Sequence, residues 1–391
     1  MLEIILANFG FWFNFLVPVA IAMFLVLTHK EYIWKEFGIQ AGATFAYVAL
    51  IYALLFSVTT DLYDTNYVNS SIKSSTYYEE WTELVTYTES YSCGTSKNPR
   101  TCTRTKTRRD HHSPYYQIKT KLGETISISR GEFLKSSRDF GKKLVRLHHG
   151  GQVSIGDGDK YVSYPSTIIP TSVGHTYENY VAVANQNVIH TKVPKENIKL
   201  LVKEGKLREY PELYDGVYGE TLLNRVIDTT GLIRINYKKL NLIATQLGEA
   251  RQANPIIYVT REDSSFVDAL SQYWNKGKKN DVTFVIGVNS EGVIIWTDVI
   301  CFTNNTDFIV DMQNDFTIKE TKLNDKSVIE HFSYLVNKSY IRKPMKEFEY
   351  LKENITLEWY WQLLIFMGNL IMSGFITYKF LNNYDRKRTW K

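Results

Sequence analysis

The chain has 391 residues, of which 44% are hydrophobic and 22% are charged, and its formal net charge is +5. This small excess is due partly to a basic C-terminal tail, so it does not indicate a nucleic-acid-binding protein. With 27 tyrosines and only 9 prolines, the chain is also too aromatic for a disordered linker, and we expect a folded protein.

Three long runs without charged residues predict three membrane-spanning helices. These runs cover residues 4–28, 37–60 and 359–378. Each reaches the roughly 20 apolar residues that a helix needs to cross a bilayer. The first run lacks the basic start of a signal peptide, and a second run follows after a short loop, so we interpret it as a retained helix. We therefore expect two helices in residues 1–60 and a third in residues 356–380.

Basic residues in short segments predict the orientation. Lys30 and Lys35 lie in the loop 29–36, and the tail 381–391 is also basic. Because short cytoplasmic segments are enriched in lysine and arginine, we place this loop and the tail in the cytoplasm. The N-terminus and residues 61–355 then lie outside it. The expected location is the inner (cytoplasmic) membrane, with the lipid bilayer as one partner and a large periplasmic domain.

The first part of this domain, residues 61–217, is predicted to be rich in β-strands. Residues 75–92 are rich in tyrosine, threonine and valine, and residues 115–130 hold two strand-like runs around a turn at Leu122-Gly123-Glu124. Residues 131–149 fit a short helix or a strand, and their pattern does not decide between the two.

Two of the three cysteines lie in an unusual stretch, SCGTSKNPRTCTRTKTRRDHH, at residues 92–112. In an oxidising compartment Cys93 and Cys102 are expected to form a disulfide that closes a short loop. The alternatives are free thiols, or a zinc site made by both cysteines with His111 or His112. Zinc knuckles usually have two to four residues between their cysteines, whereas eight separate these two, so the spacing disfavours zinc.

The basic residues of 97–109 alternate with threonines, which is typical of the solvated face of a strand. A patch for an acidic partner or for anionic lipid is the other interpretation. Further along, the stretch GHTYENYV groups four polar side chains that could meet a ligand or a neighbouring subunit, although a structural role is the simpler expectation. They are His175, Tyr177, Glu178 and Asn179.

From residue 218 to residue 355 the pattern changes to alternating helices and strands, so the predicted fold class is α+β or α/β. The expected helices are 222–231, 238–254, 264–277 and 326–341, and the expected strands are 255–260, 281–288 and 293–302. The last two strands are separated by Asn289-Ser290-Glu291-Gly292 and predict a hairpin.

Part of this block, about residues 236–302, resembles the extracytoplasmic TPM domain. The resemblance lies in QLGEARQANPIIYVTREDSSFVDALSQYWNKGKKNDVTFVIGVNSEGVIIW. The chain also resembles membrane proteins of large tailed phages and bacteria, through GHTYENYV (174–181), GKKND (277–281) and RKPMKEFEYL (342–351). The TPM resemblance implies either an assembly factor or a metal-dependent phosphatase. For a phosphatase, the candidate ligands of a divalent cation are Glu262, Asp263 and Asp281.

The sequence favours binding over catalysis. It contains no glycine-rich phosphate loop, no GxSxG and no HExxH. The expected function is a membrane-anchored binding or assembly module at the cell envelope, with a protein partner, no nucleic acid and no required cofactor. Self-association is left open, and the alternative function is a metal-assisted hydrolase. Transport is disfavoured because the interiors of the three apolar runs carry no charged residue.

Overall fold

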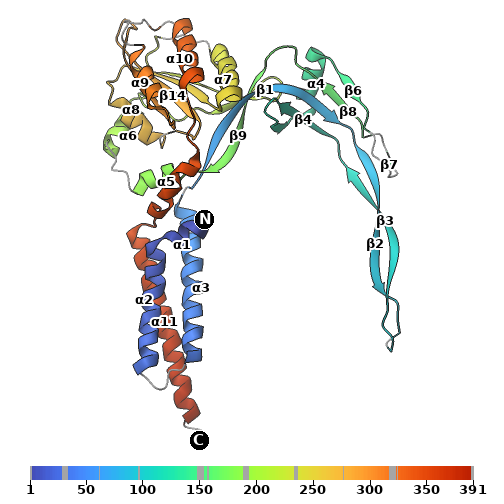
Figure 1. The fold of residues 1–391 in the computed structure, drawn as a ribbon, viewed down its shortest axis with the longest axis vertical. Coiled ribbons are helices and arrows are strands. Elements are labelled where there is room, and N and C mark those ends of the chain that lie inside the picture. Colours follow the sequence, from blue (N-terminus) through green and yellow to red (C-terminus); the bar gives the residue numbers. More distant parts are fainter. Residues whose placement is uncertain are drawn as a thin grey trace.

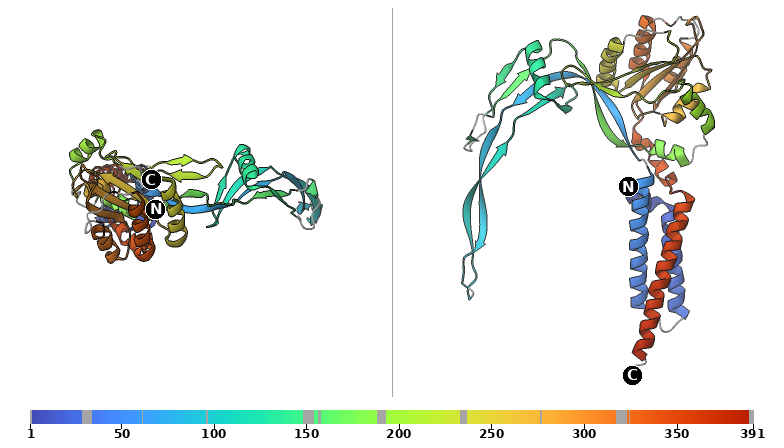
Figure 2. Two further views of the ribbon diagram at one scale, coloured as in Figure 1. Left: turned by 90° about the horizontal axis from the view of Figure 1, so that it is seen from above. Right: turned by 180° about the vertical axis from the view of Figure 1, so that it is seen from behind.

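The computed structural model describes residues 2–28, 34–60, 62–95, 97–147, 154–155, 158–187, 193–232, 237–275, 277–316, 323 and 325–388. Figure 1 shows three parts: a helical bundle, an α/β body above it, and a curved β arm that leaves the body to one side. Both views in Figure 2 show the arm standing away from the body.

The bundle holds the apolar segments. It consists of α1 (Leu2–Ala7), α2 (Phe9–Thr28), α3 (Trp34–Thr59) and α11 (Trp359–Arg388). Two helices, Trp34–Thr59 and Trp359–Phe380, are long and apolar enough to cross a membrane, whereas the apolar helix Phe9–Phe24 is shorter. Two of the three expected spans thus have the required length and composition, and the first stays a prediction. Residues 29–33 of the expected cytoplasmic loop and residues 389–391 of the tail lie outside the described residues.

Buried amide side chains connect the three long helices. The Asn369 amide donates a hydrogen bond of 2.8 Å to the Asn14 carbonyl, which links α11 to α2. The Gln40 amide donates one of 3.2 Å to the Ser373 carbonyl, which links α3 to α11. Such bonds stabilise helix association in lipid, where no hydrophobic effect acts between helices.

The arm is built on one strand, β1 (Tyr63–Tyr78), which begins almost directly after α3. The lower half of β1 pairs with β9 (Pro170–Glu178), and its upper half pairs with β4 (Tyr115–Thr120) and β8 (Lys160–Ser163), all antiparallel. The strands β5 (Thr125–Ser127) and β6 (Lys143–Val145) complete the sheet in the order β5-β4-β1-β8-β6. The predicted strands about Leu122-Gly123-Glu124 are confirmed as β4 and β5.

Residues 131–149, which fitted either a helix or a strand, contain both. The helix α4 (Arg130–Phe140) begins at Ser129, whose side chain caps Glu132 N–H, while the Glu132 carboxylate accepts from Ser129 N–H. This capping box fixes the helix start, and Phe133 packs on the sheet beside Tyr77. The chain then enters β6.

A long hairpin extends from the end of the arm. The strands β2 (Trp81–Ser92) and β3 (Thr101–His112) pair in register from Trp81 opposite His112 to Ser92 opposite Thr101. The short strand β7 (Ser154–Ile155) pairs with β2 near its start. At the tip, Cys93 and Cys102 form a disulfide, as expected, with their Cα atoms 5.7 Å apart.

Removing the disulfide should loosen only the tip. A double Cys93→Ser, Cys102→Ser variant loses at most about 2–3 kcal/mol of local stability, because the closed loop is short. Amide hydrogen exchange should accelerate near Ser92 and Thr101 and stay unchanged in the α/β body. A linked peptide in a non-reduced digest checks the bond itself. Zinc that co-purifies, and is lost when His111 and His112 are replaced, would contradict this pairing.

The α/β body is a four-stranded sheet between two layers of helices. Its strand order is β12 (Val226–Asp228), β13 (Asn254–Thr260), β14 (Asp281–Val288) and β15 (Ile294–Cys301), of which only β15 is antiparallel. The helices α7 (Tyr237–Arg251), α9 (Thr306–Asn314) and α10 (Asp325–Ser339) cover one face, where Ile257 and Phe284 are buried. The helix α8 (Phe266–Tyr273) covers the other face, where Tyr258 and Val285 are buried. Parallel strands buried on both faces have continuous apolar sequences, as these do.

Residues before 218 also belong to this body. The helix α6 (Lys195–Lys203) contributes Ile198 and Leu201 to the core beside α8, and Leu207 is buried there. Between the arm and α6 lies α5 (Tyr180–Asn187). The short strands β10 (Leu213–Asp215) and β11 (Thr221–Leu223) pair with each other. The segment η1 (Met345–Asn354), a 3-10 helix, leads to α11.

The helix predicted at 222–231 is wrong, whereas those at 238–254, 264–277 and 326–341 are confirmed as α7, α8 and α10. Residues 222–231 hold the end of β11 and the strand β12 instead. Val226 lies opposite Ile257 and Asp228 opposite Val259 in a parallel pair. A short apolar run fits either structure by periodicity alone, and pairing with β13 decides for the strand. The predicted strands 255–260, 281–288 and 293–302 are confirmed.

Cys301, at the end of β15, should resist alkylation in the native protein. Its side chain packs against the main core of the body, and burial raises the pKa of the thiol to about 12. Since the thiolate is the reactive form, N-ethylmaleimide at neutral pH should modify it only after unfolding. A Ser264→Cys variant, exposed on the same body, serves as the positive control. Rapid modification of native Cys301 would show that β15 is not packed this way.

Candidate functional site

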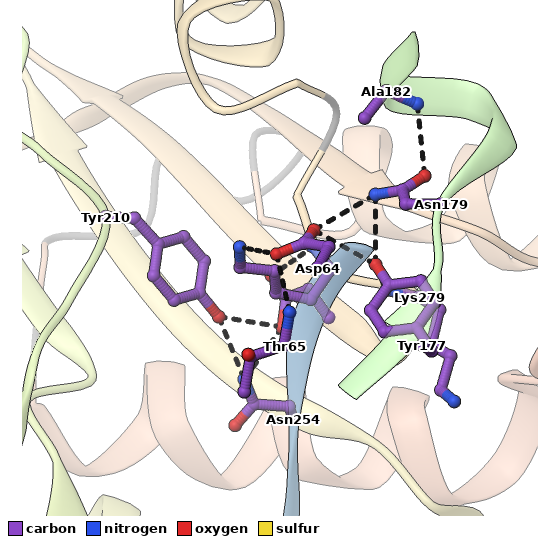
Figure 3. A network of polar contacts seen from close by, with 10 residues as sticks. Asp64, Thr65, Tyr177, Asn179, Ala182, Tyr210, Asn254 and Lys279 are labelled. Carbon is purple, nitrogen blue, oxygen red and sulfur yellow. Dashed lines mark hydrogen bonds and ion pairs between the residues drawn. The ribbon is translucent and has the colours of Figure 1, made fainter. Parts of the chain in front are cut away.

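The root of the arm meets the α/β body in a network of polar side chains (Figure 3). Asp64 lies at the start of β1. Its carboxylate accepts hydrogen bonds from the Tyr177 hydroxyl at 3.2 Å and the Asn179 amide at 3.0 Å, and it forms an ion pair with Lys278. Asp64 therefore ties β9 and the loop before β14 to the first residues beyond the bundle.

The loop before β14 contacts Tyr177 again. The Lys279 backbone N–H donates to the Tyr177 hydroxyl at 3.0 Å, and the Lys279 ammonium lies 4.6 Å from the ring centre. Burial, and then the nearby Asp64 carboxylate, raise the pKa of Tyr177, which stays neutral. The stretches 174–181 and 277–281 thus contact each other.

Asp281 is the buried acid of this network. Its carboxylate accepts hydrogen bonds from Lys278 N–H at 2.7 Å, the Asn254 amide at 2.7 Å and the Tyr210 hydroxyl at 3.0 Å. Burial raises the pKa of Asp281 to about 6, although these three donors oppose the shift. The carboxylate is therefore charged at neutral pH at a cost in solvation.

Arg225 is the buried base. Its guanidinium donates to the side chains of Asn69 on β1 and Ser172 on β9, at 2.6 and 2.8 Å. It also donates to Asn241 on α7 at 2.9 Å and to Asn254. Burial lowers the pKa of Arg225 to about 10, so it stays charged at neutral pH. One side chain thus joins two strands of the arm to a helix and a strand of the body.

Asn254 connects the two buried charges. Its Oδ1 accepts from Arg225, and its Nδ2 donates to Asp281. The oxygen and the nitrogen of this neutral amide are both hydrogen-bonded, so Asn254 links Arg225 to Asp281 without direct contact between the two charges. Because these donors and acceptors bind one another, we interpret the network as a structural joint between arm and body. We call this network the arm joint; its members are Asp64, Tyr177, Asn179, Tyr210, Arg225, Asn254, Lys278 and Asp281.

Close packing supports this interpretation. On α7, a Cβ at Gly248 would lie only 2.2 Å from the Asn69 carbonyl of β1, so only glycine fits there. The next residue, Glu249, accepts hydrogen bonds from Ser71 N–H at 3.0 Å and the Ser71 hydroxyl at 2.8 Å. Helix α7 therefore holds β1 directly beside the arm joint.

The four residues proposed to meet a ligand or subunit divide between the interior and the surface. Tyr177 and Asn179 are buried in the arm joint. The His175 ring lies 3.2 Å from the Glu124 carboxylate within the arm, and Glu178 accepts from the Tyr180 hydroxyl. Tyr177, Glu178 and Asn179 thus have hydrogen-bond partners within the chain, and His175 lies next to an acidic side chain.

The three candidate cation ligands lie at opposite ends of the sheet. In the parallel pair, Asn254 is opposite Asp281 and Thr260 is opposite Gly287. Asp281 is thus at the start of the strands, while Glu262 and Asp263 follow their end, about 20 Å away at 3.3 Å per residue. Glu262 forms an ion pair of 3.1 Å with Lys206, and Asp263 accepts from Ser265 N–H at 2.9 Å.

The candidate ligands of the zinc alternative are also far apart. Cys93 and Cys102 are bonded to each other at the tip, whereas His111 and His112 lie at the far end of β3, about 30 Å away. The His112 ring stacks on Trp81 with centroids 4.2 Å apart. Within the described part of the chain, no three His, Cys, Asp or Glu residues are grouped so that they could hold a metal ion.

The hairpin β2–β3 is the second candidate site. Along β2 and β3, which the structure describes in full, no side chain is buried. Glu89 forms ion pairs of 2.6 Å with both Arg104 and Lys106. Among the described residues Lys97 and Arg100, at the tip, have exposed side chains without an ion pair. Among the described strands, the hairpin thus offers a polar, positively charged surface along the outer edge of β3 and along the part of β2 beyond its short pairing with β7.

Comparisons with known proteins give no further assignment. No family model, curated protein or solved structure matches the chain. The resemblances to TPM domains and to phage proteins therefore stay predictions.

Sequence reasoning missed two residues at the centre of the arm joint: Asp64 on β1, and Arg225, which immediately precedes β12. Asp64 follows an apolar run without a motif, and Arg225 lies in a segment predicted to be helical. A signal existed for Lys278, because GKKND was already singled out.

Proposed function

We propose that the protein is a membrane-anchored module that binds a protein partner, or assembles with one, on the extracytoplasmic side of the cell envelope. The observation that carries this proposal is the hairpin β2–β3, a long ribbon with no buried side chain. Two-stranded ribbons are marginally stable alone in water, and open strand edges readily pair with other chains. A ribbon of this length, stabilised by a disulfide at its tip, suits contact with another protein.

The anchoring part of the proposal extends to α2. Its contacts with α11 through Asn14 and Asn369 support a third span parallel to the two longer helices. With the basic loop 29–36 and the tail in the cytoplasm, residues 61–355 lie outside it. An inner membrane with a periplasmic domain is the setting that this orientation fits.

The position of the hairpin favours a protein over lipid as its partner. Figure 1 shows that the hairpin bends down to the level of the bundle, well away to one side of it. If the bundle spans a bilayer, lipid at that level would have to receive charged side chains and unpaired backbone groups. Each unsatisfied group costs several kcal/mol in hydrocarbon. A protein surface, either another protein or a second copy of this chain, is therefore the partner that we propose.

The hydrolase alternative needs its acidic groups in one cavity, and Asp281 lies far from Glu262 and Asp263, as described above. We therefore propose no second function. An origin in a large phage stays a proposal that rests on the resemblance alone.

Cysteine labelling in intact cells and in inverted vesicles tests the orientation. A Lys35→Cys variant should react only from the cytoplasmic side and a Lys199→Cys variant only from the outside. The background from the wild-type chain should be low, because two cysteines are paired and Cys301 is packed. Labelling of position 199 from the cytoplasm would reverse the proposed topology.

Site-specific photo-crosslinking tests the partner. A photoreactive residue at Tyr91, which is 42% exposed on the hairpin, should give a discrete protein adduct in native membranes. The same residue at Tyr334, 57% exposed on the body, is the matched control and should not give that adduct. Two differently tagged copies of the chain distinguish self-association from a second protein. Adducts with lipid alone, or the same adduct from both positions, would overturn the proposal.

A further inference from the structure

A cleft of about 460 Å³ lies where the bundle meets the extracytoplasmic part. It is lined by the end of α3, the start of α11 and the segments nearest to them, including Thr60, Val183, Lys195, Glu358, Tyr360 and Trp361. Figure 1 shows this region at the top of the bundle, beside α5. Its volume is within the range of small-molecule sites.

Two opposite charges line the cleft. Lys195 begins α6, and Glu358 immediately precedes α11. Both side chains are exposed, and neither forms an ion pair with another residue that the structure describes. A ligand that carries one negative and one positive group would complement both.

Aromatic side chains at the cleft suit a position at a bilayer surface. Trp359 is 73% exposed and Tyr360 44% exposed at the first turn of α11, and Trp361 packs against the bundle core. Tryptophan and tyrosine favour the level of lipid headgroups. Below the cleft, the apolar outer surfaces of α3 and α11 can accommodate acyl chains.

We propose that this cleft binds the headgroup of a zwitterionic phospholipid. The Lys195 ammonium binds the phosphate, and the Glu358 carboxylate binds the headgroup amine, in charge-assisted contacts. A primary ammonium can donate hydrogen bonds to the carboxylate, so an ethanolamine headgroup fits better than a choline headgroup. This inference rests on the membrane anchoring in the proposed function and is independent of the hairpin.

The test measures binding of short-chain phospholipids to the full chain in detergent. Dihexanoyl phosphatidylethanolamine should bind more tightly than the choline and glycerol lipids of the same chain length. Lys195→Ala and Glu358→Gln should each weaken it by about tenfold, the loss of one charge-assisted contact. Lys199→Ala and Glu196→Gln, exposed on the same helix α6, are the matched controls and should leave binding unchanged. O-phosphoethanolamine, which lacks chains, distinguishes a free headgroup from a lipid and should bind more weakly.

Three outcomes overturn the inference: equal binding of the glycerol lipid, unchanged binding in both cleft variants, or equal loss in the controls. Lys195→Arg keeps the charge and should restore most of the affinity, which separates loss of contact from loss of folding. Resistance of the chain to carbonate extraction from membranes is measured in parallel. If the chain is extracted, the proposed anchoring fails. If it resists extraction but does not discriminate headgroups, only the cleft proposal fails.

Discussion

Replacing Arg225 by alanine should lower the free energy of unfolding by about 3–5 kcal/mol, because buried acceptors on four elements would lose their donor. Asn69 and Ser172 on the arm, and Asn241 and Asn254 on the body, would lose their bonds from the guanidinium, whereas the bonds from Ser172 to Asn69 and from Asn69 to Asn254 would remain. Urea unfolding of the full chain in detergent, followed by tryptophan fluorescence, measures the change. Limited proteolysis should also cut more readily between arm and body.

Arg261→Ala is the matched control. Arg261 is exposed on the same body and donates one bond of 3.3 Å to the Thr230 carbonyl, so its loss should change stability by less than about 0.5 kcal/mol. Arg225→Lys keeps the charge but not the forked geometry, and we expect an intermediate loss. An Arg225→Ala variant within about 1 kcal/mol of the wild type would show that the arm joint does not depend on this side chain.

The second large effect depends on pH. The pKa of Asp281 is 3.8 in an unfolded chain and about 6 in the folded protein. Because the folded pKa is raised, the folded state binds more protons between these values, and the contribution of Asp281 to stability falls as the pH rises from about 4 to about 6. The shift corresponds to about 3 kcal/mol. Asp281→Asn cannot ionise and should lose this dependence.

The measured quantity is the difference in unfolding free energy between variant and wild type at several pH values. It should move in favour of Asp281→Asn by up to about 3 kcal/mol between pH 4 and pH 7. Asp263→Asn is a control of opposite sign, because the hydrogen bonds from Ser265 lower the pKa of Asp263. The difference in unfolding free energy between Asp263→Asn and the wild type should move in favour of the wild type as the pH rises. A flat difference for Asp281→Asn would mean that its carboxylate is solvated in the folded state.

The strands of the α/β body could be predicted because consecutive apolar residues indicate strands that are buried on both faces. PIIYVT and DVTFVIGV are apolar on both faces, as a strand between two helical layers requires. The strand at 226–228 could not be predicted, since only its pairing with β13 distinguishes it from a helix. The alternation of threonine with basic residues in β3 was sufficient to predict an exposed strand.

The arm joint could not be predicted from the sequence because its residues come from distant segments of the chain. Asp64 and Lys278 are 214 positions apart, and Arg225 meets Asn69 across 156. No local pattern specifies such contacts. Grouped polar residues in GHTYENYV pointed to a binding surface, whereas folding turned Tyr177 and Asn179 inward to bind Asp64.

Because β1 starts four residues after the last residue of α3, a movement of α3 would act on the arm close to Asp64. The 16 residues of β1 reach up to about 50 Å at 3.3 Å per residue. A tilt of α3 by about 5° would thus sweep the far end of β1 through roughly 4 Å over that length. Load applied at the hairpin would return to the bundle as a torque on the same helix. A force on the tip of the hairpin and a tilt of α3 would then be mechanically coupled.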